Sequence, residues 1–115
     1  MMKTMQQLNL KENERRALQK LKQRLLEKYP ATEIILYGSK ARGDFHKESD
    51  IDLLILFDLP LNSKFGEEIT RITFDIELEY DVIFGKILEN KKYWNNSLAQ
   101  AMPLHWNIDK EGIPI

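Results

Sequence analysis

Residues 33–57 read EIILYGSKARGDFHKESDIDLLILF, and the pattern of these residues predicts the central part of the fold. Its two ends are apolar runs, 33–37 and 51–57, whose length and isoleucine content favour buried strands. The polar stretch between them is punctuated by Gly38 and Gly43, as connections are. Strands that follow one another in sequence are usually neighbours in space, so the two runs predict adjacent strands of one sheet.

The segments on either side of this stretch predict helices and a third strand. Pro30 ends a first amphipathic helix, and a second helix is expected to begin near Ser63 as its N-cap. Residues 81–84 then read as a third strand, and Pro103 and Gly112 would open and close a last helix. The apolar stripes that predict the two long helices are Leu10, Ala17, Leu18, Leu21, Leu25 and Tyr29 in the first, and Ile69, Ile72, Ile76 and Tyr80 in the second.

These elements predict an α/β (α+β) fold. The connection between the second and third strands is long enough for a helical crossover, which predicts parallel pairing of those two strands. We therefore expect one domain over residues 1–115, with a small mixed β-sheet and helices mainly on one face.

Composition narrows the class of protein. The net charge of −1 gives no global electrostatic reason to expect a nucleic-acid partner. The absence of cysteine excludes disulfides and thiolate metal sites. No apolar run approaches the roughly 20 residues of a membrane span, and residues 1–10 lack the apolar core of a signal peptide, so we expect a cytoplasmic protein.

Two aspartates stand at the head of the second strand. Alternation along a strand puts Asp50 and Asp52 on the same face, about 7 Å apart. Two such carboxylates repel each other, and burial disfavours their charge. Divalent cations would neutralise them, and hard oxygen ligands suit Mg²⁺ or Mn²⁺. The alternative is a pair of solvated aspartates that merely end a strand.

The glycine segment predicts a phosphate cradle. Its G-x-x-x-x-G spacing matches a P-loop, but Asp44 and Phe45 stand where Lys and Ser or Thr are required. What remains is a strand that runs through Gly38 and Ser39 into a helical turn, where backbone amides and the Ser39 hydroxyl favour phosphate oxygens. Lys40 and Arg42 add positive charge. The alternative is an ordinary turn, but beside paired carboxylates a metal-bridged triphosphate fits better.

The two motifs together resemble a known signature. Gly-Ser-x-Ala-Arg-Gly at 38–43 and Ser-Asp-Ile-Asp-Leu-Leu at 49–54 are similar to the signature of the DNA polymerase β-like nucleotidyltransferase superfamily. The short length resembles its minimal nucleotidyltransferases, which are often the antitoxin half of HEPN–MNT toxin–antitoxin pairs. The match covers about 34–84, and 107–113 resembles the close of such proteins more loosely.

The resemblance implies a role for each matching residue. Gly38 and Ser39, together with Arg42, would bind the phosphates of the nucleotide. Asp50 and Asp52 would ligate two Mg²⁺ ions, with Mn²⁺ as a substitute. A third carboxylate would complete one metal site and help to deprotonate the acceptor, and Asp81 is the candidate for this catalytic role. Glu77 and Glu79 are the nearby alternatives.

The resemblance also implies the reaction and the partner. We expect transfer of a nucleoside monophosphate, AMP from ATP by family default, to a hydroxyl group of a HEPN-type toxin. Two alternatives stay open, namely an antitoxin that acts by binding alone and a free-standing nucleotidyltransferase that modifies a small molecule. The acceptor and the oligomeric state also stay open. An aromatic and apolar segment near the C-terminus would either contact the partner or close the core: Tyr93, Trp94, Met102, Leu104 and Trp106.

Overall fold

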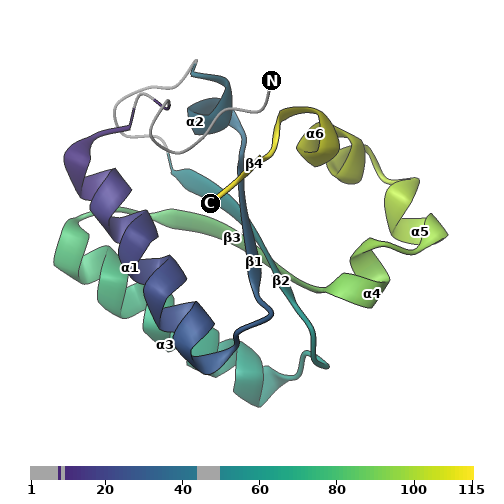
Figure 1. Ribbon diagram of the computed structural model, residues 1–115, viewed down its shortest axis with the longest axis horizontal. Helices are drawn as coiled ribbons and strands as arrows, with labels where there is room; N and C mark the ends of the chain where they lie inside the picture. The colour runs from purple at the N-terminus through teal and green to yellow at the C-terminus, as the bar shows by residue number, and fades with distance from the viewer. Residues whose placement is uncertain (1–7, 9, 44–49) are drawn as a thin grey trace.

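The computed structural model describes residues 8, 10–43 and 50–115, and over these residues the chain forms a four-stranded mixed sheet between two layers of helices (Figure 1). The strand order is β3-β2-β1-β4. β2 pairs with β1 in antiparallel and with β3 in parallel orientation, and β4 pairs antiparallel with β1. The strands are β1 (Glu33–Tyr37), β2 (Ile51–Phe57), β3 (Phe84–Asn90) and β4 (Ile113–Pro114).

The predicted fold class is confirmed. The two apolar runs are β1 and β2, and the long connection after β2 is a helical crossover to the parallel strand β3. β4 was not predicted, because two paired residues are too short to produce an alternating pattern.

The two long helices, α1 (Glu12–Lys28) and α3 (Ser63–Tyr80), lie side by side on one face of the sheet (Figure 1). Their predicted stripes form the main core with the residues of β2 that point to this face, from Ile51 to Phe57. The N-cap of α3 is Asn62 and not Ser63, because the Asn62 side chain accepts a hydrogen bond of 2.8 Å from the Phe65 amide. In the described part of the chain, no helix has the length and apolar character that crossing a membrane requires.

The other face of the sheet carries the short helices α4 (Lys91–Trp94), α5 (Ser97–Gln100) and α6 (Pro103–Glu111) (Figure 1). Leu54 and Leu56 of β2 pack there against Trp94 and Ile108. β2 is thus apolar on both faces over most of its length, which is why helices cover both. The prediction of helices mainly on one face holds for the two long ones, and the predicted bounds of the last helix, Pro103 and Gly112, are confirmed.

Candidate active site

The turn after β1 has the backbone shape that its glycines permit. Gly38 has φ +77°, and the four-residue helix α2 (Ser39–Arg42) follows it and ends at Gly43 with φ +87°. The amides of Ala41 and Arg42 both donate to the Gly38 carbonyl at 3.1 Å. Gly43 is in the left-handed region, where a side chain costs roughly 1–2 kcal/mol, and Gly38 combines its positive φ with ψ −158°, a region that essentially only glycine adopts. The helical turn predicted after Gly38-Ser39 is therefore present.

Asp52 lies between two glycines. In the register of the sheet it is opposite Tyr37 of β1 and beside Gly85 of β3. A Cβ atom on Gly38 would overlap the Asp52 carboxylate, and one on Gly85 would lie 2.7 Å from Asp52 Oδ1 and 3.9 Å from the Cβ of Asp50. Asp50 and Asp52 therefore come together at the same end of the sheet as Gly38, and bare backbone flanks the Asp52 carboxylate on both sides.

The electrostatics of this end of the sheet favour a bound cation. Burial raises the pKa of Asp52 above its usual range, and the negative charge of Asp50 raises it further, while the Arg42 guanidinium opposes both. Burial, followed by the charge of Asp52, also raises the pKa of the Tyr37 hydroxyl. Ionised Asp52 is thus disfavoured in the protein alone, and a cation beside it would remove that cost.

A carboxylate from the C-terminal helix reaches the predicted phosphate cradle. Arg42 Nη1 donates to Glu111 Oε1 and Oε2, at 3.1 Å each. The same Oε1 accepts a hydrogen bond from the backbone amide of Gly38 at 3.4 Å. Sequence reasoning missed Glu111, although its place within 107–113, the tail that resembles the close of short nucleotidyltransferases, was a signal that could have drawn attention to it.

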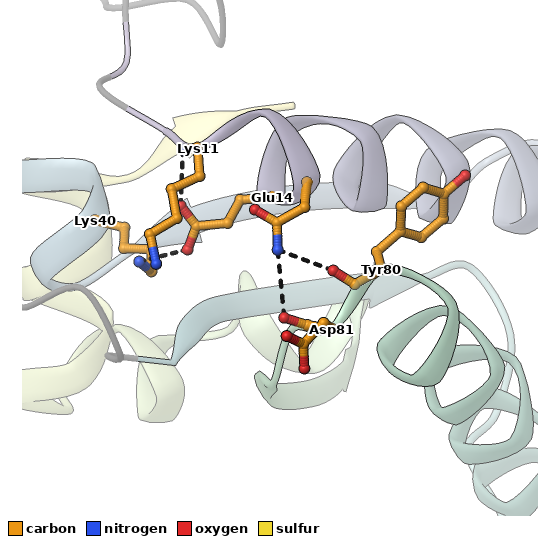
Figure 2. A network of polar contacts seen from close by, with 6 residues as sticks. Lys11, Glu14, Lys40, Tyr80 and Asp81 are labelled. Atoms are coloured by element: carbon orange, nitrogen blue, oxygen red, sulfur yellow. Dashed lines mark hydrogen bonds and ion pairs between the residues drawn. The ribbon is translucent and has the colours of Figure 1, made fainter.

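Lys40 does not contribute its charge to the cradle, so that expectation is wrong. Its side chain is fully buried, and its Nζ lies 2.5 Å from Glu14 Oε2 of α1 (Figure 2). Glu14 is also buried, and its Oε1 accepts a hydrogen bond of 2.9 Å from the Lys11 amide. Lys40 therefore ties α2 to the start of α1, while Arg42, two residues on, faces the cradle.

Asp81 does not open the third strand, and that part of the prediction is wrong. It is the C-cap of α3 with φ +56°, and β3 begins only at Phe84. Its carbonyl and that of Tyr80 accept hydrogen bonds from the Asn13 side chain, at 3.3 and 2.9 Å (Figure 2). The cause is a left-handed residue between helix and strand, a conformation that aspartate tolerates better than most residues.

The β3 residue beside Asp52 is Gly85 and not a carboxylate. Of the two alternatives, Glu77 accepts a hydrogen bond of 2.9 Å from the Phe84 amide, and Glu79 is exposed on α3. Within 10–43 and 50–115, no three acidic or histidine side chains are grouped so that they could hold a metal ion. Asp81 therefore does not join Asp50 and Asp52 in a preformed set of three ligands. Ser49 and the rest of 44–49 lie outside the described residues.

Comparison with known families agrees with this arrangement. A model described as "Nucleotidyltransferase domain" matches residues 18–106, which include β1, the α2 turn, β2 and β3. The chain belongs to this family. The matched residues include Asp50, Asp52 and the whole turn from Gly38 to Gly43.

Two relatives come from Methanocaldococcus jannaschii. "Putative protein adenylyltransferase MJ0604" is 32% identical over 102 residues, which cover 87% of this chain and 95% of the relative. "Putative protein adenylyltransferase MJ1379" is 38% identical over 76 residues, covering 64% and 76%. The nucleotidyltransferase family and these relatives support a transferase.

Solved structures with the same fold are toxin–antitoxin proteins. One, a toxin–antitoxin described with AMP-PNP, has a TM-score of 0.54 and is 22% identical in sequence. The match covers 86% of this chain and 69% of the solved chain. A second, a mutant of the MntA-HpeT pair, has a TM-score of 0.54 and 22% identity over 91% and 72%. At this identity the likeness establishes the fold, and the nucleotidyltransferase fold predicted for the chain is confirmed.

The glycine turn gives a first testable prediction. Gly43→Ala should cost roughly 1–2 kcal/mol of unfolding free energy, because its φ is positive and its surroundings are open. Gly38→Ala should cost about 1–3 kcal/mol more, since its backbone region is essentially closed to a side chain and the Asp52 side chain must also shift. Urea unfolding of both variants measures the difference. Equal losses would contradict both the backbone requirement at Gly38 and the close approach of Asp52.

Proposed function

We propose that this protein transfers AMP from ATP to a hydroxyl group on a partner protein, a HEPN-type toxin. The observation that carries the proposal is the meeting of Asp50 and Asp52 with the Gly38–Arg42 turn at one end of the sheet. The names of the relatives favour adenylyl transfer to protein. The toxin–antitoxin neighbours, one of them with AMP-PNP, favour a toxin partner and an adenine nucleotide.

The residues at this site fit Mg²⁺. Magnesium is usually held in nucleotide enzymes by one or two carboxylates together with substrate phosphates and water, so a third protein carboxylate is not required. Asp50 and Asp52 supply two, and because burial and then the charge of Asp50 raise the pKa of Asp52, a bound cation would offset the cost of its ionised form. Bound Mg²⁺ would stabilise charge on the attacking and leaving oxygens of an in-line displacement. Mn²⁺ would suit the same ligands.

The remaining groups of the chain bind and orient. The Gly38 amide, the Ser39 hydroxyl and the Arg42 guanidinium hold the phosphate oxygens. The acceptor hydroxyl oxygen forms a bond to the α-phosphorus, and the bond from that phosphorus to the oxygen bridging to the β-phosphate breaks. Pyrophosphate leaves, and the hydroxyl proton passes to a carboxylate of the Asp50–Asp52 pair. The scheme does not require Asp81, which is the C-cap of α3 and forms no group of three ligands with the pair in the described part of the chain.

A second candidate function is neutralisation of the toxin by binding alone. It is favoured by apolar side chains left exposed on the short C-terminal helices, since Leu98 is 69% and Trp106 65% exposed. Trp94, by contrast, is buried against β2 and closes the core. The predicted partner segment is thus divided between the core and the surface.

One experiment separates these functions. The protein is purified together with a HEPN-type toxin encoded beside it, incubated with ATP and Mg²⁺, and the toxin is weighed by intact mass spectrometry. We expect the toxin to gain the mass of one or more AMP groups, with none gained when Asp50→Asn replaces the wild type. A toxin that co-purifies and stays unmodified would leave binding alone as the function. A toxin that neither binds nor changes in mass would leave a free-standing enzyme with another acceptor.

A further inference from the structure

The donors expected for the nucleotide's phosphates already hold an anion that belongs to the chain itself. Glu111, the last residue of α6, accepts from the Gly38 amide at 3.4 Å and from Arg42 Nη1 at 3.1 Å through both oxygens. A carboxylate and a phosphate compete for such donors because both present anionic oxygens to amide and guanidinium groups.

We propose that Glu111 is a resident anion in the phosphate cradle, and that a nucleoside triphosphate must displace its carboxylate from Gly38 and Arg42 in order to bind. The inference rests on the proposed function, since it requires the triphosphate to occupy the turn after β1. It adds a residue from the C-terminal helix that sets how tightly the nucleotide is held.

Charge explains why Glu111 must leave rather than share the cradle. Arg42 already binds the Glu111 carboxylate through Nη1, at 3.1 Å from each oxygen. Lys40, the other cation of α2, forms an ion pair with Glu14. A triphosphate placed beside an unmoved Glu111 would add like charge next to it, and the Gly38 amide has only one hydrogen to donate.

The contact is weak enough to be broken by a ligand. The Arg42 side chain is 47% exposed and that of Glu111 21%, so solvent screens their attraction. The backbone of the segment is independently fixed, because the Gly112 amide donates to the Ile108 carbonyl at 2.7 Å and Ile113 pairs with Leu36 of β1. The Glu111 side chain can therefore leave the cradle while α6 and β4 stay in place.

The test compares Glu111→Gln with wild type and with Glu67→Gln, by calorimetric titration of Mg·ATP and of Mg·tripolyphosphate. Tripolyphosphate probes the phosphate cradle without a nucleoside. Glu111→Gln should bind both ligands roughly two- to fivefold more tightly, because the displaced group no longer carries charge. Glu67→Gln removes the same charge from an exposed site on α3, so it should bind like wild type.

A second variant guards against a folding defect in the first. Glu111→Asp keeps the charge but shortens the side chain, so it cannot reach both Gly38 and Arg42, and it too should bind both ligands more tightly. If the wild type binds both ligands and both variants bind them equally tightly or more weakly, the inference is overturned. Glu111 would then be a group that positions Arg42. If neither wild type nor variants bind Mg·ATP, the proposed function itself fails.

Discussion

Replacing Asp52 with Asn should lower the rate of AMP transfer by about 10²–10³-fold, the size of effect seen when one electrostatic group is removed from an enzyme's reaction centre. The substitution preserves shape, so the Asn side chain still fits between Gly38 and Gly85. It removes the negative charge that would hold Mg²⁺ beside the phosphates. The loss should therefore come from electrostatics rather than from altered packing.

The same substitution should raise the stability of the nucleotide-free protein at neutral pH. The pKa of Asp52 is raised by burial and by Asp50, so the folded state binds its proton more tightly than the unfolded state does. Stability must therefore fall as pH rises from the unfolded value of about 3.9 through the folded pKa, and the whole cost is present above the folded pKa. Asn carries no charge at any pH and avoids that cost.

Single-turnover transfer and the melting temperature of Asp52→Asn test the expected loss of rate and the expected gain in stability. Asp58→Asn is the matched control, because it removes an exposed carboxylate just beyond the opposite end of β2 and should transfer at the wild-type rate. A slower Asp52→Asn that melts at or above the wild-type temperature supports a role in the reaction. Transfer at the wild-type rate would show that Asp52 takes no part in it.

The features that could be predicted from sequence depend on local pattern. Apolar runs bounded by turn residues identify β1 and β2, and the length of the following connection predicts the parallel crossover. Strand alternation alone puts Asp50 and Asp52 on one face. Each of these conclusions needs only the local order of residues. The strands and the parallel crossover agree with the structure, and Asp50 and Asp52 both lie close to Gly85.

The features that could not be predicted depend on contacts distant in sequence. Lys40 and Arg42 are alike as cations within one short helix, and the buried Glu14 of α1, which pairs with Lys40, distinguishes them. Glu111 reaches Arg42 because α6 returns across the sheet to place it there. The prediction that Asp81 opens the third strand was wrong for a local reason. Residues 81–84 have the apolar pattern of a strand, but the first of them has a left-handed backbone conformation.

The contact between Lys40 and Glu14 carries the largest expected effect on stability. Lys40→Met should lower the free energy of unfolding by about 3–5 kcal/mol, because it leaves the Glu14 carboxylate buried without the ammonium group 2.5 Å away. Both side chains are nearly inaccessible, at 0% exposure for Lys40 and 6% for Glu14, so water cannot replace the lost partner. Urea unfolding measures the loss, and Lys22→Met on the exposed side of α1 should change stability by less than about 0.5 kcal/mol.

A double-mutant cycle separates the pair from the burial of either group. Glu14→Gln alone should also destabilise, since it leaves the Lys40 ammonium buried beside a neutral amide. The double variant should lose much less than the sum of the two single losses, because it leaves no buried charge behind. Additive losses would contradict the ion pair as the tie between α2 and α1. Non-additive losses would mean that the ion pair between Lys40 and Glu14 itself stabilises the position of α2, the helical turn that also carries Ser39 and Arg42.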